Sequence, residues 1–229
     1  MTDKLTYECS DGIAHLHMDD GKANVMTEEM LTALLAAFDR AEGDQAVVLL
    51  SGRQRMFSGG YDLKMFSEGP QKIVRTLRLG AQLVLRMASF PLPVLIACTG
   101  HAVAQGAFTL LGADLRLGAA GPFKYSLNEV AIGLTIPHYG VEIARMRLQP
   151  SYFQHATITA ATYTPDDALR AGFVDLVVPE EGLMERAFEE AERLRKLNMP
   201  AHAGTKLRVR AAALELIRAS IDQELVVPE

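Results

Sequence analysis

Two glycine-containing segments of the chain carry the residue types best suited to chemistry. The sequences FSGGYDL (57–63) and GHAVAQGAF (100–108) each follow a short apolar run and lead into a helix-like pattern. The first N–H groups of a helix lack internal partners, and the aligned peptide dipoles make that end favour negative charge. Two such ends lying side by side would form an oxyanion hole, which stabilises the enolate of a thioester. The small residues Gly60, Ala104 and Gly106 would let a substrate reach the backbone.

Buried strands must position these two segments. The run AVVLL (46–50) is short, continuous and rich in β-branched residues, and residues 94–98 repeat the pattern, as expected for strands covered on both faces. A glycine pair after such a strand is also explained by a plain strand-to-helix connection, and this alternative stays open for the segment taken alone. Each unit consists of a strand, a tight turn and a helix, which predicts stacked α/β units.

The N-terminal part of the chain predicts a hairpin followed by a helix. Residues 7–18 alternate around a turn at Ser10–Gly12, which places His15 and His17 on one face of a sheet. A helix is predicted to begin after Thr27, because threonine is a favourable N-cap and acidic and apolar residues follow at helical spacing.

The C-terminal part of the chain is rich in helix formers. It predicts two amphipathic helices, which separate a core of residues 1–179 from a C-terminal region of residues 180–229. We expect this region to cap the core or to form contacts between subunits, without folding as an independent domain. Lys206, Arg208 and Arg210 are expected to lie on the polar face of the last helix, and the alternative is that they contact a substrate bound to this or a neighbouring subunit.

Composition argues against several classes of protein. The 229 residues include 23 Lys plus Arg and 28 Asp plus Glu, and the net charge of −5 gives no basic footprint for nucleic acid. We expect a cytoplasmic protein without a membrane segment, because no apolar run approaches the roughly 18 residues of a membrane helix. Cys9 and Cys98 are expected to be small hydrophobes, and no metal site is predicted. The glycine pattern fits neither the GxGxxG motif of dinucleotide-binding proteins nor the P-loop, so no nucleotide cofactor is expected.

Three segments, in order, resemble motifs of the crotonase superfamily, also called the enoyl-CoA hydratase/isomerase family. FSGGYDL resembles the FxxGxDL loop, GHAVAQGAFTLLGADLRLG resembles GxAxGGGxxLxxxxDxR, and SLNEVAIGLTIP resembles PExxLGLxP. The resemblance covers about residues 5–220. It implies an α/β fold, a crotonase-type spiral of repeated β-β-α units with a C-terminal helical region. It also implies an acyl-CoA substrate, in which CoA is part of the substrate and no separate cofactor is needed, and a homotrimer or hexamer.

The resemblance also implies catalytic roles. The N–H groups of Tyr61 and Gln105 correspond to the oxyanion donors, and Glu129 corresponds to a catalytic glutamate. Phe108 stands where family members that hydrate a double bond have a second glutamate. One carboxylate is enough to move a proton from C2 to C4, and Asn128–Glu129 is similar to single-glutamate isomerases, so a 3-enoyl-CoA to 2-enoyl-CoA isomerase is predicted. The alternatives are a 2-enoyl-CoA hydratase, another crotonase reaction such as hydrolysis or decarboxylation, and a non-catalytic acyl-CoA-binding protein.

Further residues are assigned to substrate binding by the same resemblance. Lys22 would meet a CoA phosphate or else remain solvated, and Asp62 is expected to brace its own loop. His138 and Tyr139 would line the acyl pocket, although His138 would equally suit the start of a helix. The full predicted set of substrate-binding residues is Lys22, Ala23, Gly60, Tyr61, Asp62, Leu63, Gln105, Gly106, Phe108, Asn128 and His138.

Overall fold

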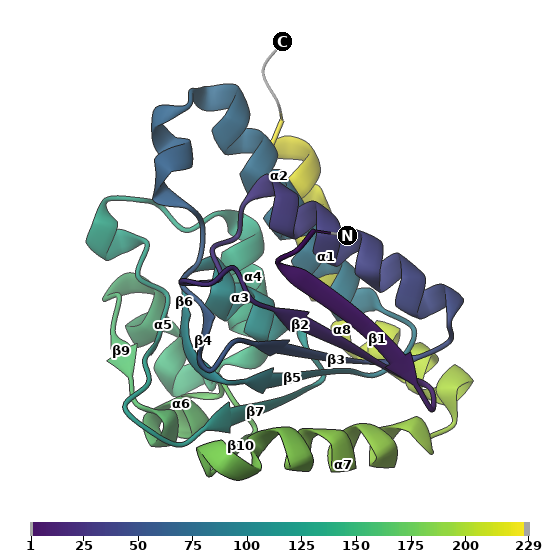
Figure 1. The fold of residues 1–229 in the computed structure, drawn as a ribbon. Helices are drawn as coiled ribbons and strands as arrows, with labels where there is room; N and C mark the ends of the chain where they lie inside the picture. Colours follow the sequence, from purple (N-terminus) through teal and green to yellow (C-terminus); the bar gives the residue numbers. More distant parts are fainter. Residues whose placement is uncertain (1, 227–229) are drawn as a thin grey trace.

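The computed structural model describes residues 2–226 and shows a spiral of strands and helices built around two sheets (Figure 1). In spatial order, the strands of the larger sheet are β1 (Leu5–Ser10), β2 (Ile13–Met18), β3 (Val47–Gly52), β5 (Val94–Cys98), β7 (Leu115–Ala119) and β10 (Leu176–Val178). This sheet is parallel except for β1 and β2, which form the antiparallel hairpin predicted from the sequence. β3 and β5 are buried along their whole lengths, as predicted for strands covered on both faces.

A smaller sheet is made of four short strands. In spatial order they are β4 (Arg55–Ser58), β6 (Gly100–Val103), β8 (Tyr125–Ser126) and β9 (Thr162–Tyr163). β4, β6 and β8 run parallel to one another, and β9 joins β8 in the antiparallel sense. The carboxyl ends of β4, β6 and β8 therefore lie at one edge of the smaller sheet.

Consecutive strands alternate between the two sheets. The pairs β3–β4, β5–β6 and β7–β8 each place one strand in the larger sheet and the next strand in the smaller one. A helix follows each pair, namely α2 (Pro70–Ser89), α3 (Gln105–Gly112) and α4 (His138–Arg147). Short 3-10 turns, η1 (Leu63–Ser67) and η2 (Val130–Ile132), precede α2 and α4. This arrangement confirms the predicted spiral of repeated β-β-α units.

The first helix forms as the sequence predicts. It is α1 (Glu28–Gly43), and the Thr27 side chain caps it by accepting a hydrogen bond from Met30 N at 3.2 Å. Leu34 and Phe38 are fully buried. The Phe38 ring meets that of Phe90, just after α2, edge-on with 5.3 Å between ring centroids. The two helices are thereby joined through their apolar faces.

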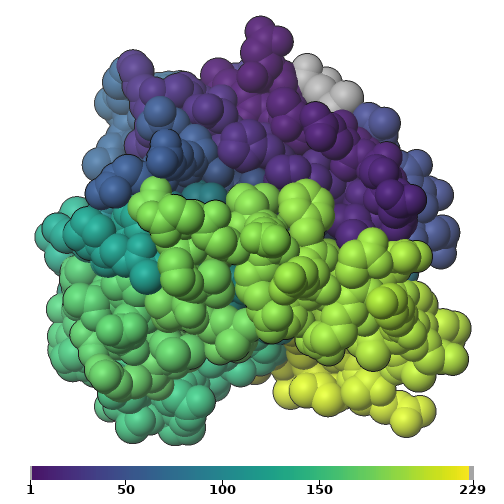
Figure 2. Space-filling view, turned by 60° about the horizontal axis from the view of Figure 1, so that its bottom comes forward, coloured from purple at the N-terminus to yellow at the C-terminus, as the bar shows by residue number. Residues whose placement is uncertain are grey.

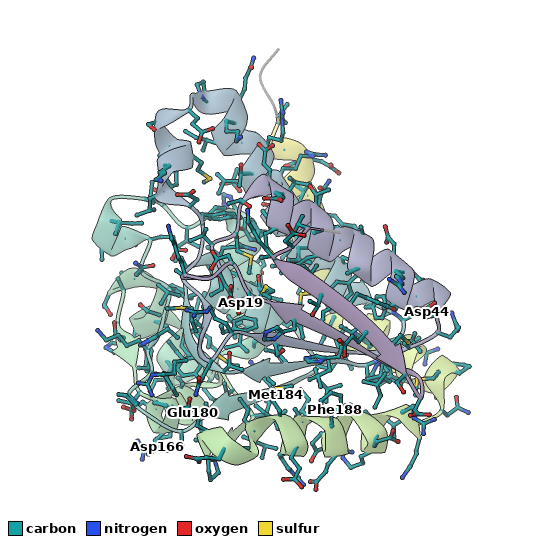
Figure 3. The ribbon with its side chains drawn as sticks, in the orientation of Figure 1. Asp19, Asp44, Asp166, Glu180, Met184 and Phe188 are labelled. Carbon is teal, nitrogen blue, oxygen red and sulfur yellow. The ribbon has the colours of Figure 1, made fainter. Side chains whose placement is uncertain are left out.

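One face of the larger sheet carries the histidines of β2. His15 Nε2 and His17 Nδ1 each lie 2.9 Å from the Ser51 hydroxyl on β3, which confirms that both side chains share a sheet face. The helix α7 (Leu183–Arg195) covers this face, and its Phe188 ring lies edge-on to His15 with 5.4 Å between ring centroids. Met184 and Phe188 are on the side of α7 that faces the sheet (Figure 3).

The remaining helices complete the shell around the sheets. They are α5 (Pro150–Ile158), α6 (Pro165–Ala171), the turn η3 (Glu180–Gly182) and α8 (Met199–Gln223). α8 packs mainly against α2 and α4, and the C-terminal segments cover a broad area of the face seen in Figure 2. Among residues 2–226, no helix has both the length and the apolar character needed to cross a membrane.

Two basic residues of α8 are buried, which corrects the expectation that they lie on a polar face. Lys206 Nζ lies 2.7 Å from one carboxylate oxygen of Asp114, and Arg210 Nη2 lies 2.9 Å from the other. Burial lowers the pKa of the Lys206 ammonium to about 8. Arg208 stays exposed. The physical reason is that Asp114, at the start of β7, is itself largely buried and needs opposite charges.

Candidate active site

The carboxyl ends of three parallel strands bring the predicted catalytic residues to one edge of the smaller sheet. Tyr61 follows β4, Gln105 follows β6, and Glu129 follows β8. Residues that directly follow neighbouring parallel strands lie together, and ligands commonly bind at this edge in α/β folds. The fold therefore places three distant parts of the chain around one site.

The first glycine-containing segment (57–63) turns sharply at Gly60, whose φ of +91° favours glycine. Gly60 N donates to the Ser58 hydroxyl at 3.1 Å, and Gly60 O accepts a hydrogen bond from Met26 N at 2.8 Å. Asp62 then caps η1, because its Oδ1 accepts a hydrogen bond from Lys64 N at 3.0 Å. The bracing role predicted for Asp62 is therefore confirmed.

The second glycine-containing segment (100–108) turns at Ala104, with φ +50° and ψ −124°. Such a conformation costs a residue other than glycine about 1–3 kcal/mol. Ala104 N donates to Ser126 O at 2.9 Å, which ties the turn to β8. The two turns are in close contact, since a methyl group at Gly60 would lie 3.3 Å from Gln105 N. Within residues 2–226, the N–H groups of Tyr61 and Gln105 donate no hydrogen bond, so both can bind a ligand oxygen.

A cavity of about 140 Å³ opens at this edge of the sheet. Its wall is mostly apolar and is built from both turns and from residues of η1, α2, α3, η2 and α4. The lining residues are Gly59, Tyr61, Leu63, Phe66, Leu77, Ala104, Phe108, Asn128, Glu129, Ile132, Leu134, Thr135, Pro137 and Tyr139.

Glu129 is the one acidic side chain among the described residues that line this cavity. The residue is only 6% exposed, and its Oε2 has no hydrogen-bond partner within residues 2–226. Burial raises the pKa of its carboxyl to about 7. Asn128 beside it also has a buried side-chain oxygen that is unpaired within the same residues. A carboxyl group that titrates near neutrality can both take up and return a proton, which suits a general acid–base catalyst.

A chain of buried hydrogen bonds fixes the side chains behind the two N–H groups. Tyr61 Oη donates to Tyr139 Oη at 2.8 Å, and Tyr139 Oη donates to Gln105 Oε1 at 2.7 Å. Gln105 Nε2 donates to Gly80 O at 3.2 Å, which joins the chain to α2. A methyl group at Gly80 would lie 2.0 Å from Tyr61 Oη, so the ring fits only because residue 80 is glycine. Burial raises the pKa of both tyrosine hydroxyls, which keeps them protonated.

Leu63 and Phe108 line the cavity as expected, whereas His138 does not. His138 is exposed at the start of α4, with its N and Nδ1 atoms 2.9 and 3.2 Å from a carboxylate oxygen of Glu224. Successive side chains of a helix point about 100° apart, so the next residue, Tyr139, faces the cavity instead. The alternative reading of His138, as the start of a helix, is the one that fits its position.

Six other predicted residues do not line the cavity, namely Lys22, Ala23, Gly60, Asp62, Gln105 and Gly106. Lys22 is exposed. Ala23 O accepts a hydrogen bond from Gly59 N at 2.8 Å and so supports the first turn. Gly106 lets α3 approach β4, because a methyl group there would lie 2.6 Å from Ser58 O.

Part of the cavity wall was not assigned to the site from the sequence. Phe66 and Leu77 come from η1 and α2, and Ile132, Leu134 and Pro137 come from the segment around η2. Isolated apolar residues at such positions are indistinguishable from ordinary core residues. The residues around η2 had a signal, because they belong to the segment SLNEVAIGLTIP (126–137), and Phe66 follows shortly after the glycine turn. Leu77 had no signal.

The fold is that of the crotonase superfamily. Residues 8–225 match the family model described as enoyl-CoA hydratase/isomerase, so the chain belongs to that family. The predicted resemblance is thereby confirmed. A solved structure described as the enoyl-CoA isomerase of Mycobacterium tuberculosis superposes with a TM-score of 0.93 at 46% identity, covering 97% of each chain.

Two curated relatives are more distant in sequence. Human mitochondrial enoyl-CoA delta isomerase 1 is 27% identical over 206 residues, covering 88% of this chain and 68% of its own length. A probable enoyl-CoA hydratase of Mycobacterium tuberculosis, EchA17, is 27% identical over 195 residues, covering 84% of this chain and 74% of its own length. The family therefore includes similar proteins named for either of two reactions.

Proposed function

We propose that this protein shifts the double bond of a 3-enoyl-CoA to give the conjugated 2-enoyl-CoA. The observation that carries the proposal is the single cavity acid, Glu129, which is buried and unpaired within the described residues and has a pKa of about 7. The wall position where hydrating relatives are expected to have a second glutamate is occupied by Phe108. A phenyl ring can neither activate water nor deliver a proton.

In the proposed mechanism the thioester oxygen binds between the N–H groups of Tyr61 and Gln105. The Glu129 carboxylate takes a proton from C2, and the electrons of that C–H bond enter the dienolate, whose negative charge on oxygen the two N–H groups stabilise. Glu129 then returns the same proton to C4, and the double bond comes to lie between C2 and C3. No proton or electron is gained or lost overall, so one carboxyl group is sufficient.

The names of similar proteins do not choose between isomerisation and hydration, because both occur among them. The mycobacterial protein that is 46% identical is itself described as an isomerase in one structure and as a probable hydratase in another. The proposal therefore depends on the composition of the cavity wall and on the environment of Glu129.

The direct test is to incubate the protein separately with 3-enoyl-CoA and 2-enoyl-CoA and to follow the absorbance of the conjugated thioester. We expect formation of the conjugated product from the first substrate and no loss of the second. Glu129→Gln should lower kcat about 100- to 10,000-fold while leaving CoA ligand binding in place. Wild-type kcat/KM should rise with pH and level off above about 7, because the base must be ionised.

Glu190 provides a matched control. It is also 6% exposed, but it lies on α7 and pairs with Arg186 and Arg193. Glu190→Gln should retain wild-type turnover. Consumption of 2-enoyl-CoA as fast as 3-enoyl-CoA, or substantial activity in Glu129→Gln, would contradict the proposal.

A further inference from the structure

We infer that the site accepts short acyl groups, of up to about six carbons, and that Phe108 and Tyr139 set this limit. The inference rests on the proposed function, because it assumes that the acyl group of a CoA thioester occupies the cavity beside Glu129. It adds the class of substrate, which the family does not specify.

The size of the cavity gives the limit. A protein cavity of about 150 Å³ holds benzene, which has six carbon atoms. The cavity beside Glu129 has a volume of about 140 Å³. It must hold the acyl carbons from C2 onward, since the proton transfers at C2 and C4 both require Glu129. An acyl group much longer than hexanoyl therefore exceeds the available space.

The inner wall of the cavity is held too firmly to give way. Phe108 is 1% exposed, and its ring lies edge-on to that of Tyr139 with 5.8 Å between centroids. Behind it, a methyl group at Gly140 would come within 2.8 Å of the Phe108 ring, so no spare room remains on that side. Tyr139 is fixed at its hydroxyl by Gln105 and at its backbone N by the Ser220 hydroxyl, at 3.1 Å. Close-packed interiors resist such displacements.

The outer side of the cavity offers a longer chain little burial. Leu63 on η1 and Ile132 on η2 line this side and are 61% and 45% exposed. A chain that outgrew the cavity would have to bend back past these two side chains toward water. Methylene groups beyond the limit would therefore add little to the binding free energy.

Binding of saturated acyl-CoAs tests the limit without requiring turnover. We would measure the affinities of butyryl-, hexanoyl-, octanoyl- and decanoyl-CoA for the whole protein by isothermal titration calorimetry. Affinity should rise about fourfold per methylene group up to about hexanoyl-CoA and then stop rising or fall. A continued fourfold rise through decanoyl-CoA would overturn the inference.

Variants of Phe108 test which residue sets the limit. Phe108→Ala removes the six ring carbons and should raise the affinity for decanoyl-CoA relative to butyryl-CoA at least tenfold. If this variant does not fold, Phe108→Leu should show a smaller shift in the same direction. Phe38→Leu, in an equally buried position on α1 and outside the cavity, should leave the chain-length series unchanged.

The outcomes separate this inference from the proposed function. A chain-length limit that moves with Phe108 supports the inference even if 3-hexenoyl-CoA is not isomerised, in which case the proposed reaction alone fails. Isomerisation of 3-decenoyl-CoA with kcat/KM equal to that of 3-hexenoyl-CoA would leave the reaction standing and refute the length limit. If the acyl-CoA affinities of both Phe108 variants depend on chain length as those of the wild type do, Phe108 does not set the length limit.

Discussion

Glu129 combines features that ordinarily destabilise a protein. Its carboxyl group is buried among apolar residues and has no partner for one oxygen within the described part of the chain. Its pKa of about 7 means that the folded state favours the protonated form more than an unfolded chain does. Sites of this kind trade stability for activity. The trade should be measurable as a dependence of stability on pH.

We predict that the free energy of unfolding of the wild-type protein falls as the pH rises from about 4.5 to about 7, because of the raised pKa of the Glu129 carboxyl. Between these values the folded state binds more protons than the unfolded state, so the free energy of unfolding falls with pH. Glu129→Gln cannot ionise, and at pH 8 its free energy of unfolding should exceed that of wild type by up to about 3 kcal/mol. The excess should disappear near pH 4.

Urea unfolding of both proteins at pH 4 and pH 8 provides the measurement. Glu190→Gln should show no stabilisation at pH 8, because that carboxylate is paired with arginines. If the difference in the free energy of unfolding between wild type and Glu129→Gln is equal at the two pH values, ionisation of Glu129 does not destabilise the folded state, and the prediction is wrong.

At the scale of elements, the proposed oxyanion hole depends on how closely α2 approaches this edge of the smaller sheet. The Tyr61 ring lies against α2 at Gly80, and the hydrogen-bond chain through Tyr139 and Gln105 returns to the Gly80 carbonyl. The position of the first N–H donor is thus coupled to a helix that does not contain it. A small change in α2 should therefore alter kcat.

We predict that Gly80→Ala impairs both activity and stability. The added methyl group would meet the Tyr61 hydroxyl, so the ring or the helix must move, at a cost of about 1–3 kcal/mol for overpacking. Displacing Tyr61 also moves its N–H group, so kcat should fall more than the affinity for substrate.

Gly204→Ala on α8 is the matched change, since a methyl group there would meet nothing within 4 Å. It should leave kcat unaltered and add up to about 1 kcal/mol of helix stability. Thermal unfolding and steady-state kinetics measure the stability and kcat of both variants. Wild-type values for Gly80→Ala would mean that the contact has no role.

At the scale of the whole molecule, the C-terminal region is tied to the core through charges. Asp114, just before β7, forms ion pairs with Lys206 and Arg210 of α8. Arg210 also donates a hydrogen bond to the carbonyl oxygen of Ala88 at 3.0 Å. These contacts join α8 to α2 and β7. The division at residue 179 and the trimer or hexamer expected from the resemblance both stay predictions.

We predict that Asp114→Asn lowers the free energy of unfolding by about 3–5 kcal/mol, because it leaves two buried cations without their counter-charge. Asp222→Asn, which removes an exposed ion pair with Arg78, should cost less than about 1 kcal/mol. Denaturant unfolding gives both values. We expect amide hydrogen exchange of Asp114→Asn to rise in both α8 and β7, because the two elements belong to one cooperative unit. A rise in α8 alone would contradict this expectation.

Local patterns predicted most of the fold. The cap at Thr27 and the strand at 94–98 follow from a few neighbouring residues, and both were recovered. The smaller sheet could not be found from periodicity, because strands of two to four residues are too short to show any. It was reached only through the resemblance, which implied the β-β-α units.

The candidate site was predictable where motifs are continuous and not where distant helices meet. Tyr61, Gln105 and Glu129 each belong to a short motif, and the fold brings them to one edge. Gly80 gave no local signal, because its importance comes from a contact with a residue in another element. Lys206 looked like a surface residue for the same reason, since its partner lies far away in the chain.

The hydrogen-bonded pair of Tyr61 and Tyr139 has an optical consequence. The chain contains six tyrosines and no tryptophan, so its intrinsic emission on excitation near 280 nm comes from tyrosine alone. Two of the six line the cavity, and Tyr139 donates its hydroxyl hydrogen to the side-chain amide oxygen of Gln105. Filling the cavity should therefore alter the native fluorescence directly, which provides a label-free reporter of occupancy for any ligand that is itself transparent near 280 nm.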